Sequence, residues 1–282
     1  MSTEAFFTEE PITWLQDLLG EFGLDVALAV TYLGDIAAYI VILSLVYWFW
    51  EHERGATLIA LALLALSSGL FIKEVVAMSR PPAELWVTEE LGPGLPSVHA
   101  LSAVVVYGTM ARYLPVGTQQ IRVVSAIGIV LAVAVSRVAL GVHYIGDVIA
   151  GLVIGVLILG LFLRFYNGRT TSLFLVAVVL AGGAAFLSGG EYYPMALTAG
   201  SVGALAGWML ASDRSVSYPA PIVSVPLVLL AGLHLVPGSS GNPMVLVIAA
   251  NFAIGIIVLG FPQAVSLYYR FSPRVLVPNR HE

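Results

Sequence analysis

Polar and charged residues of a few types stand at the edges of long apolar runs in this chain. They form three groups, which are Lys73 with Arg80, Ser97 with His99, and Arg137 with His143 and Asp147. Ionisable side chains are costly inside a bilayer, so at such positions they indicate a function. Cations that hold an anion, and imidazoles that attack or protonate, are the groups that phosphate chemistry requires. The three groups therefore predict a pocket that binds a phosphate and attacks it.

The three cations, Lys73, Arg80 and Arg137, fit a phosphate ligand. Phosphoryl transfer spreads charge over three equatorial oxygens, and its catalysis is mostly positioning and electrostatic stabilisation. Arginine contacts two oxygens at once, whereas lysine supplies a compact charge. Lys73 is the one lysine among the 12 lysines and arginines, which favours a specific role for it. The alternative is that Lys73 and Arg80 only reach the membrane surface from helix ends.

Ser97 follows Pro96 at the expected start of a helix. Serine caps helices well, and a helix N-terminus offers free N–H groups to an anion. A plain cap and a phosphate contact use the same geometry, so the two interpretations are compatible.

His143 and Asp147 are four residues apart and share a face if they lie on a helix. A carboxylate that accepts from one imidazole nitrogen fixes the tautomer and leaves the other nitrogen free to attack. The alternative is an aspartate that caps a helix beside an interfacial histidine. Ser136-Arg137 at a fixed distance before the pair favours the catalytic interpretation.

The composition excludes several classes of protein. Of the 282 residues, 59% are hydrophobic and 10% are charged, where soluble domains carry roughly 25% charged residues. The net charge of −5 gives no support to nucleic-acid binding, and the absence of cysteine excludes thiol catalysis and disulfides.

No further cluster of histidines and carboxylates has metal-site spacing, so neither a metal nor another cofactor is expected. The acidic N-terminus does not resemble a cleaved signal peptide.

Apolar runs of near-spanning length predict an all-α polytopic membrane protein. An amphipathic helix at 11–23, with Trp14 as an anchor, is expected to lie at the interface. About nine spans should follow, at 33–50, 55–73, 97–113, 121–138, 144–165, 171–188, 194–212, 219–237 and 244–267. We expect residues 1–188 to form the core, with six spans, and 189–282 to form an extension of about three spans.

The arginines outside the three groups predict the orientation. With nine spans and the N-terminus outside, all of them fall on the cytoplasmic side, as the positive-inside rule requires; they are Arg54, Arg112, Arg122, Arg164, Arg169, Arg214, Arg270, Arg274 and Arg280. The candidate site and the N-terminus then face the extracytoplasmic side, and the C-terminus faces the cytoplasm.

Helix rise supports the same arrangement. Four consecutive predicted helices carry candidate site residues near one end and an arginine near the other, 15 to 19 residues away in the sequence. These separations span roughly 22–29 Å, just under the ~30 Å of a hydrocarbon core. The candidate site therefore converges at one membrane boundary.

In order and spacing, Lys73 to Pro81, Pro96 to His99 and Ser136 to Asp147 resemble the motifs of the type 2 phosphatidic acid phosphatase superfamily. That superfamily includes lipid phosphate, polyprenyl diphosphate and sphingosine-phosphate phosphatases and glucose-6-phosphatase, and shares its site with vanadium haloperoxidases. The resemblance implies a six-helix core. It also implies that Lys73, Arg80, Arg137, the Ser97 side chain and the Val98 and His99 amides bind phosphate. Val98 replaces the glycine most common at its position.

The resemblance also implies roles for the remaining residues. His143 is the expected nucleophile that forms a phosphohistidine, Asp147 orients it, and His99 protonates the leaving alkoxide, which leaves poorly without a proton. The expected function is a metal-independent phosphatase of a lipid phosphate or polyprenyl diphosphate at the bilayer. The alternatives are a phosphotransferase to an acceptor other than water, a sugar-phosphate phosphatase, and a transporter or binding protein for a phosphorylated solute.

Overall fold

The computed structural model describes residues 6–211 and 243–271, and the regular elements in these ranges are all helical. The α-helices are α1 (Glu10–Thr31), α2 (Ile36–Phe49), α3 (His52–Val76), α4 (Val98–Tyr113), α5 (Gln119–Ala139), α6 (Ile145–Phe165), α7 (Thr170–Leu187), α8 (Tyr192–Leu210) and α10 (Met244–Phe271). Two short 3-10 turns, η2 (Tyr32–Gly34) and η3 (Ala83–Leu85), join them. The predicted all-α class is confirmed.

The helices follow the predicted spans closely, apart from 219–237, which lies outside the described residues. Five described helices are long and apolar enough to cross a membrane, namely α3, α5, α6, α7 and α10 through Ala264, and α1 with α2 makes a sixth if that bent pair is one span. At 16 residues, α4 is shorter than a usual span. These helices make the chain a multi-pass membrane protein, while the full count of nine spans stays a prediction.

The first helix extends further along the chain than the predicted 11–23. α1 consists of two helical segments that meet at a kink at Gly20, and the second segment runs to Thr31. Together with η2 it meets α2 at an angle of 50°. Helix α1 packs along α5, where Gln16 donates hydrogen bonds to the carbonyls of Leu85 and Ala139, at 2.9 and 3.1 Å. Trp14 is exposed, as expected of an anchor.

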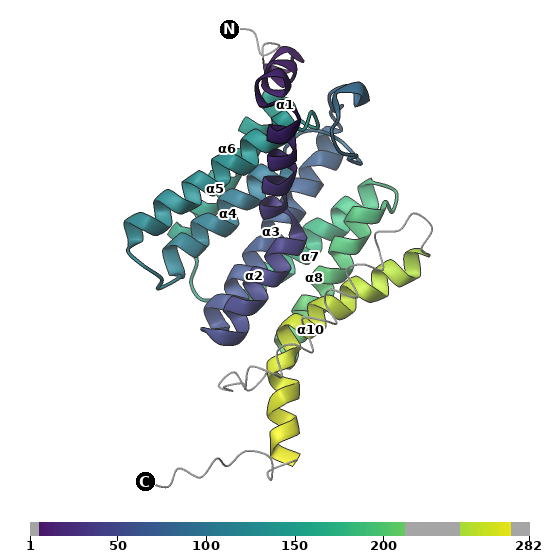
Figure 1. Cartoon of the computed structure of the whole chain (residues 1–282). Helices are drawn as coiled ribbons and strands as arrows, with labels where there is room; N and C mark the ends of the chain where they lie inside the picture. The colour runs from purple at the N-terminus through teal and green to yellow at the C-terminus, as the bar shows by residue number, and fades with distance from the viewer. Residues whose placement is uncertain (1–5, 212–242, 272–282) are drawn as a thin grey trace.

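Helix α4 lies between α3, α5 and α6 and contacts all three (Figure 1). Its approach to α6 depends on small residues, since a Cβ on Gly151 would lie 2.5 Å from the Ser97 carbonyl oxygen. The backbones therefore approach closely at the end where both helices begin. The same end holds the C-termini of α3 and α5, so four helix ends meet there.

Helix α7 packs along the other side of α3, α8 packs on α7, and α10 packs on α8 (Figure 1). One hydrophobic core joins α2, α3, α4, α7, α8 and α10, and includes Leu58, Phe174, Trp208 and Leu259. The predicted division into a core at 1–188 and an extension at 189–282 stays a prediction.

Candidate active site

Lys73 ends the long α3 helix with its side chain buried. The chain leaves the helix through Ala77, whose φ of 50° is left-handed, and the following loop folds back over the lysine. The Nζ atom donates to the carbonyls of Pro93 and Gly94, the latter at 3.1 Å. The loop thereby holds the ammonium group at the convergent helix ends.

Arg80 belongs to the same loop, and its hydrogen bonds link this loop to the turn before α6. Its guanidinium donates to the carbonyls of Gly92 and Val142, each at 2.9 Å, and to Nε2 of His143 at 3.3 Å. Its side chain is only 6% exposed. Burial lowers the pKa of Arg80, but an arginine remains charged at neutral pH.

His143 stands in the tight turn between α5 and α6, with its side chain 2% exposed. Gly141 makes this turn possible, because it has a φ of +74° and a Cβ there would lie 1.9 Å from the Leu85 carbonyl oxygen. Nδ1 of His143 is 3.2 Å from Oδ2 of Asp147. That oxygen also accepts from the backbone N–H of Tyr144 at 3.0 Å, which fixes the carboxylate.

The contacts of His143 define its tautomer. Arginine has donors only, so the nitrogen that faces Arg80 must be the acceptor, and Nδ1 carries the proton toward Asp147. Burial first, and then the charges of Lys73, Arg137 and Arg80, hold the pKa of His143 well below its ordinary value. The imidazole is therefore neutral and presents an unprotonated Nε2, which is the state that a nucleophile needs.

Ser97 and Val98 begin α4, directly against α6. The backbone N–H of Ser97 donates to the Asp147 carbonyl at 2.9 Å, which links the first turns of the two helices. The expected side-chain cap is absent: Ser97 is the N-cap residue, but its hydroxyl makes no capping bond. Val98 packs on Gly69 of α3 and lines the central cavity.

His99 lies in the first turn of α4 and faces Asp35 at the start of α2. Nε2 of His99 is 3.9 Å from Oδ2 of Asp35. The other carboxylate oxygen of Asp35 caps α2 through the N–H of Ala37. No role was predicted for this aspartate, because nothing local in the sequence pairs it with a histidine 64 residues later.

Arg137 is almost fully buried near the end of α5. It donates to the hydroxyl of Thr31 at 2.8 Å and to Oε1 of Glu90. The second oxygen of Glu90 is 3.4 Å from Arg80, so one carboxylate bridges the two arginines. Sequence reasoning missed this role of Glu90, because an acidic residue in an irregular loop gives no periodic signal.

Buried polar atoms without a partner collect among the predicted site residues. Among the described residues there are six such side-chain atoms, and three of them are Ser97 Oγ, Arg137 Nε and Asp147 Oδ1. A buried donor without a partner costs free energy. Ser97 and Arg137 therefore hold donors that a phosphate oxygen would satisfy.

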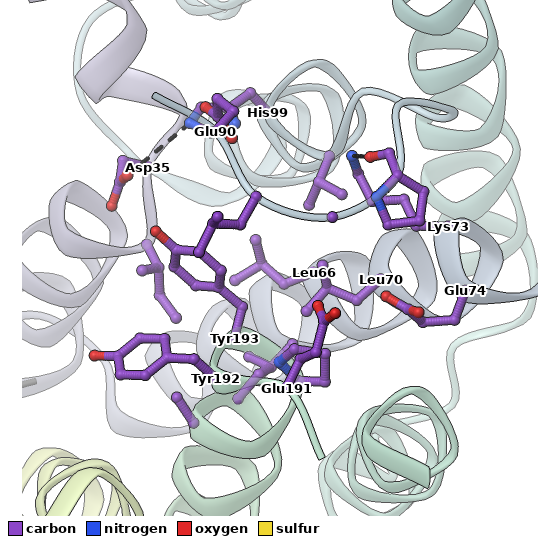
Figure 2. A pocket seen from close by; sticks show the side chains of 18 of the residues that line it. Asp35, Leu66, Leu70, Lys73, Glu74, Glu90, His99, Glu191, Tyr192 and Tyr193 are labelled. Carbon is purple, nitrogen blue, oxygen red and sulfur yellow. Dashed lines mark hydrogen bonds and ion pairs between the residues drawn. The ribbon is translucent and has the colours of Figure 1, made fainter. Parts of the chain in front are cut away.

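A cavity of about 340 Å³ opens beside these groups, within the usual size range of ligand pockets. Five of the eight predicted site residues line it, which are Lys73, Arg80, Val98, His99 and His143, while Ser97, Arg137 and Asp147 lie behind them. Figure 2 shows that Glu191, Tyr192 and Tyr193, from the start of α8, form a further part of the wall. These three residues were not predicted, because they follow a Gly-Gly turn and belong to no motif.

The structure brings all eight predicted site residues to one end of the helices. Within residues 6–211 and 243–271, no group of three histidines and carboxylates is placed to hold a metal ion. The cationic side chains, the buried hydroxyl and the oriented imidazole instead form a set suited to an anion that is attacked at its centre.

Comparison with known proteins agrees with this chemistry. Residues 55–171 match the family model described as the PAP2 superfamily. The chain is similar to lipid phosphate phosphatase delta of Arabidopsis thaliana, with 31% identity over 145 residues. That match covers 46% of this chain and 35% of the relative, so it spans about a third of the relative's length. No solved structure matches the chain.

The match to the family covers the same helices that carry the site. Lys73 to Asp147, which include every predicted site residue, lie within the matched range. The predicted resemblance is confirmed over residues 55–171, which are similar to the PAP2 superfamily.

Proposed function

We propose that this protein is a membrane-embedded phosphatase that hydrolyses a lipid phosphate or polyprenyl diphosphate through a phosphohistidine on His143. The observation that carries the proposal is the arrangement of His143, whose Nδ1 faces Asp147 and whose Nε2 faces Arg80. A phosphate that replaced part of this contact would meet an arginine and an unprotonated nitrogen together. A binding protein or transporter has no need of this oriented imidazole.

The reaction consists of two displacements at phosphorus. In the first, Nε2 of His143 bonds to phosphorus, the bond to the leaving oxygen breaks, and His99 gives that oxygen a proton. In the second, His99 takes a proton from water, the water oxygen bonds to phosphorus, and the bond to His143 breaks. Lys73, Arg80 and Arg137 stabilise charge on the equatorial oxygens in both steps. Ser97 Oγ and the N–H groups of Val98 and His99 donate to the same phosphate.

A lipid substrate is favoured by the position and lining of the cavity. It lies at the ends of apolar helices, and Leu66, Leu70 and Leu197 form part of its wall. The similarity to a protein named as a lipid phosphate phosphatase supports the same class. Short loops around the site leave little material to enclose a sugar.

We place the site on the extracytoplasmic side of the membrane. At the opposite helix ends, the guanidinium groups of Arg54 and Arg112 both stack on Tyr113, 5.9 and 5.5 Å from its ring centre. Arg122 donates to the Ala111 carbonyl at 2.9 Å beside them. Cations gathered at one end of the helices favour the cytoplasm for that end.

Phosphate release by the purified full chain in detergent tests the proposal. The substrates are dodecyl phosphate, farnesyl diphosphate, diacylglycerol phosphate and glucose 6-phosphate, each measured in excess chelator and with orthovanadate. We expect hydrolysis of the amphiphiles, inhibition by vanadate and no effect of the chelator. His143→Ala, prepared in the same way, controls for a contaminating phosphatase. Loss of activity in chelator that magnesium restores would refute the metal-independent mechanism.

A further inference from the structure

A second hollow adjoins the central cavity on the side away from the arginines. This hollow has a volume of about 70 Å³ and lies between α2, α3, α8 and α10. Five residues line both spaces, which are Ile36, Leu66, Ala196, Leu197 and Asn251. Because they share these walls, the two spaces lie side by side, and together they extend from His143 into the helical bundle.

The hollow follows one stripe along each of the four helices. On α3 the lining residues run from Leu66 back to Ala62 and Ile59, and on α8 from Ala196 to Gly200 and Ala204. Spacings of three and four residues keep a helix face constant. From Lys73 to Ile59 this stripe extends about 21 Å at 1.5 Å per residue. The path therefore runs parallel to the helices, from the phosphate end toward the middle of the spans.

The lining of the hollow is apolar apart from a few side chains, Tyr39, Ser44 and Asn251. Tyr39 is already bonded to Ser102, and the side-chain amide of Asn251 donates to the Val247 carbonyl. Ser44 Oγ is buried without a partner, so it is one polar group that the lining leaves unsatisfied. The rest of the lining offers little to water and suits a hydrocarbon. At about 70 Å³ the hollow takes a few methylene groups of one chain, and a second chain beside the first would exceed that volume.

Close packing of α8 and α10 fixes the far wall. A Cβ on Gly203 would lie 2.1 Å from the Phe252 carbonyl oxygen, and one on Gly255 would lie 2.4 Å from the Ala204 nitrogen. Gly200 differs, since its nearest neighbour would be the Asn251 carbonyl oxygen at 3.7 Å. A Cβ on Gly200 would therefore make only ordinary van der Waals contact with α10, and Gly200 lines the hollow without filling it.

Buried hydrogen bonds hold α10 against α2 beyond the hollow. The Tyr47 hydroxyl donates to the Leu259 carbonyl at 3.0 Å, and the Trp48 indole donates to the Val258 carbonyl at 2.8 Å. The wall is thus attached at both α8 and α2, so the hollow is a fixed part of the fold.

We propose that this hollow binds the hydrocarbon chain of the substrate and that the substrate has a single chain beside its phosphate. The inference rests on the proposed phosphatase function and adds a role for α8 and α10, which lie outside the family match. The phosphate lies against the cations, the first carbons of the chain pass Leu66 and Leu197, and the next carbons lie along Gly200. A single-chain alkyl or isoprenoid phosphate fits this path, whereas a two-chain lipid must leave one chain outside it.

Gly200→Leu fills the hollow without touching the phosphate site and is the variant that tests the proposal. Gly182→Leu on α7 is its matched control, because Gly182 also has open space around its Cβ position and lines neither cavity. The two are compared with wild type on butyl phosphate, whose chain ends before Gly200, and on dodecyl phosphate.

We expect Gly200→Leu to lower kcat/KM for dodecyl phosphate about tenfold or more, as overpacking of a filled site does. Its butyl phosphate activity should stay within about twofold of wild type, because the reacting groups are untouched. Gly182→Leu should match wild type on both substrates. Either of two results would overturn the proposed chain site. The first is equal activity of all three proteins on dodecyl phosphate. The second is an equal loss of activity on both substrates in a Gly200→Leu protein that has a normal size-exclusion profile.

A second measurement is independent of hydrolysis. A dodecyl phosphonate with a diazirine near its middle is photolysed on the wild-type protein, and the labelled peptides are identified by mass spectrometry. Labelling confined to α2, α3, α8 and α10, and lost in Gly200→Leu, supports the site. Labelling of the outer faces of α5 and α6 to the same extent would overturn it. If phosphate release fails for every substrate while this labelling pattern holds, the hydrolytic function fails and the chain site stands.

Discussion

The carboxylate of Glu90 forms an ion pair with Arg137, a residue that is 1% exposed. Its second oxygen approaches Arg80, so a single side chain neutralises part of the charge of two arginines. Two buried guanidinium groups without an anion would repel each other and lose hydration. If Arg80 and Arg137 bind the phosphate as proposed, Glu90 occupies part of the place of that phosphate.

Glu90→Gln is expected to tighten binding of orthovanadate and inorganic phosphate. Removing the negative charge leaves the arginines free to pair with the ligand, and we expect about a tenfold lower inhibition constant, which corresponds to ~1.4 kcal/mol. Glu89→Gln removes a neighbouring exposed charge and should change little. Weaker vanadate inhibition in Glu90→Gln would show that Glu90 instead organises the arginines for the ligand.

The acid limb of the pH profile should lie below the ordinary histidine pKa of 6.5. Because the pKa of His143 is held well below that value, its imidazole stays unprotonated, and nucleophilic, as the pH falls past 6.5. Activity is lost only when the pH reaches the lowered pKa. The profile of kcat/KM reports the free enzyme and should be corrected for ionisation of the substrate. An acid limb above 6.5 would contradict a neutral His143.

The same shift affects stability with a defined sign. Below 6.5 the unfolded chain binds a proton at His143 that the folded protein does not, so stability falls as the pH falls below 6.5. Thermal unfolding of the wild type and of His143→Gln, followed between pH 7 and pH 5, measures this. The wild type should lose more stability over the range than the variant, and equal losses would show that His143 is not buried in its neutral form.

Labelling of introduced cysteines tests the orientation of the site. The chain has no native cysteine, so each introduced thiol is the only target. Thr118 caps α5 at the arginine end of the helices, and a cysteine there should resist an impermeant reagent in intact cells and react after permeabilisation. A cysteine at the exposed Leu91, in the loop between α3 and α4 that covers Lys73, should react in intact cells. Labelling of Thr118→Cys in intact cells would reverse the proposed orientation.

The helices and the meeting of the site residues could be predicted because both depend on local pattern. Apolar runs fix where a span lies, and a residue at a helix end stays at that end whatever the packing. The sequence alone could therefore predict that Lys73 and Arg54 lie at opposite ends of α3, and that Asp147 and Arg164 lie at opposite ends of α6.

Contacts between segments far apart in the sequence could not be predicted from local pattern. Glu90 precedes its partner Arg137 by 47 residues, and Asp35 precedes His99 by 64, with no periodic pattern to connect them. The second segment of α1, which follows the kink at Gly20 and runs to Thr31, was not predicted either. It packs with the first segment along α5, a contact between elements far apart in the sequence.

The two histidines should differ in how their loss depends on the leaving group. His143→Ala removes the nucleophile, so turnover should fall on the order of 10³-fold or more with any substrate, and no acid-labile phosphoenzyme should form. His99→Ala should slow alkyl phosphates by about 10²- to 10⁴-fold but p-nitrophenyl phosphate far less, because a good leaving group needs no proton. Asp35→Asn keeps an oxygen for the cap of α2 while it removes the charge that faces His99, and it should show a weaker form of the same pattern. Rapid quench with labelled substrate measures the formation of the phosphoenzyme in each variant directly. A phosphohistidine that still forms in His143→Ala would assign the nucleophile to another residue.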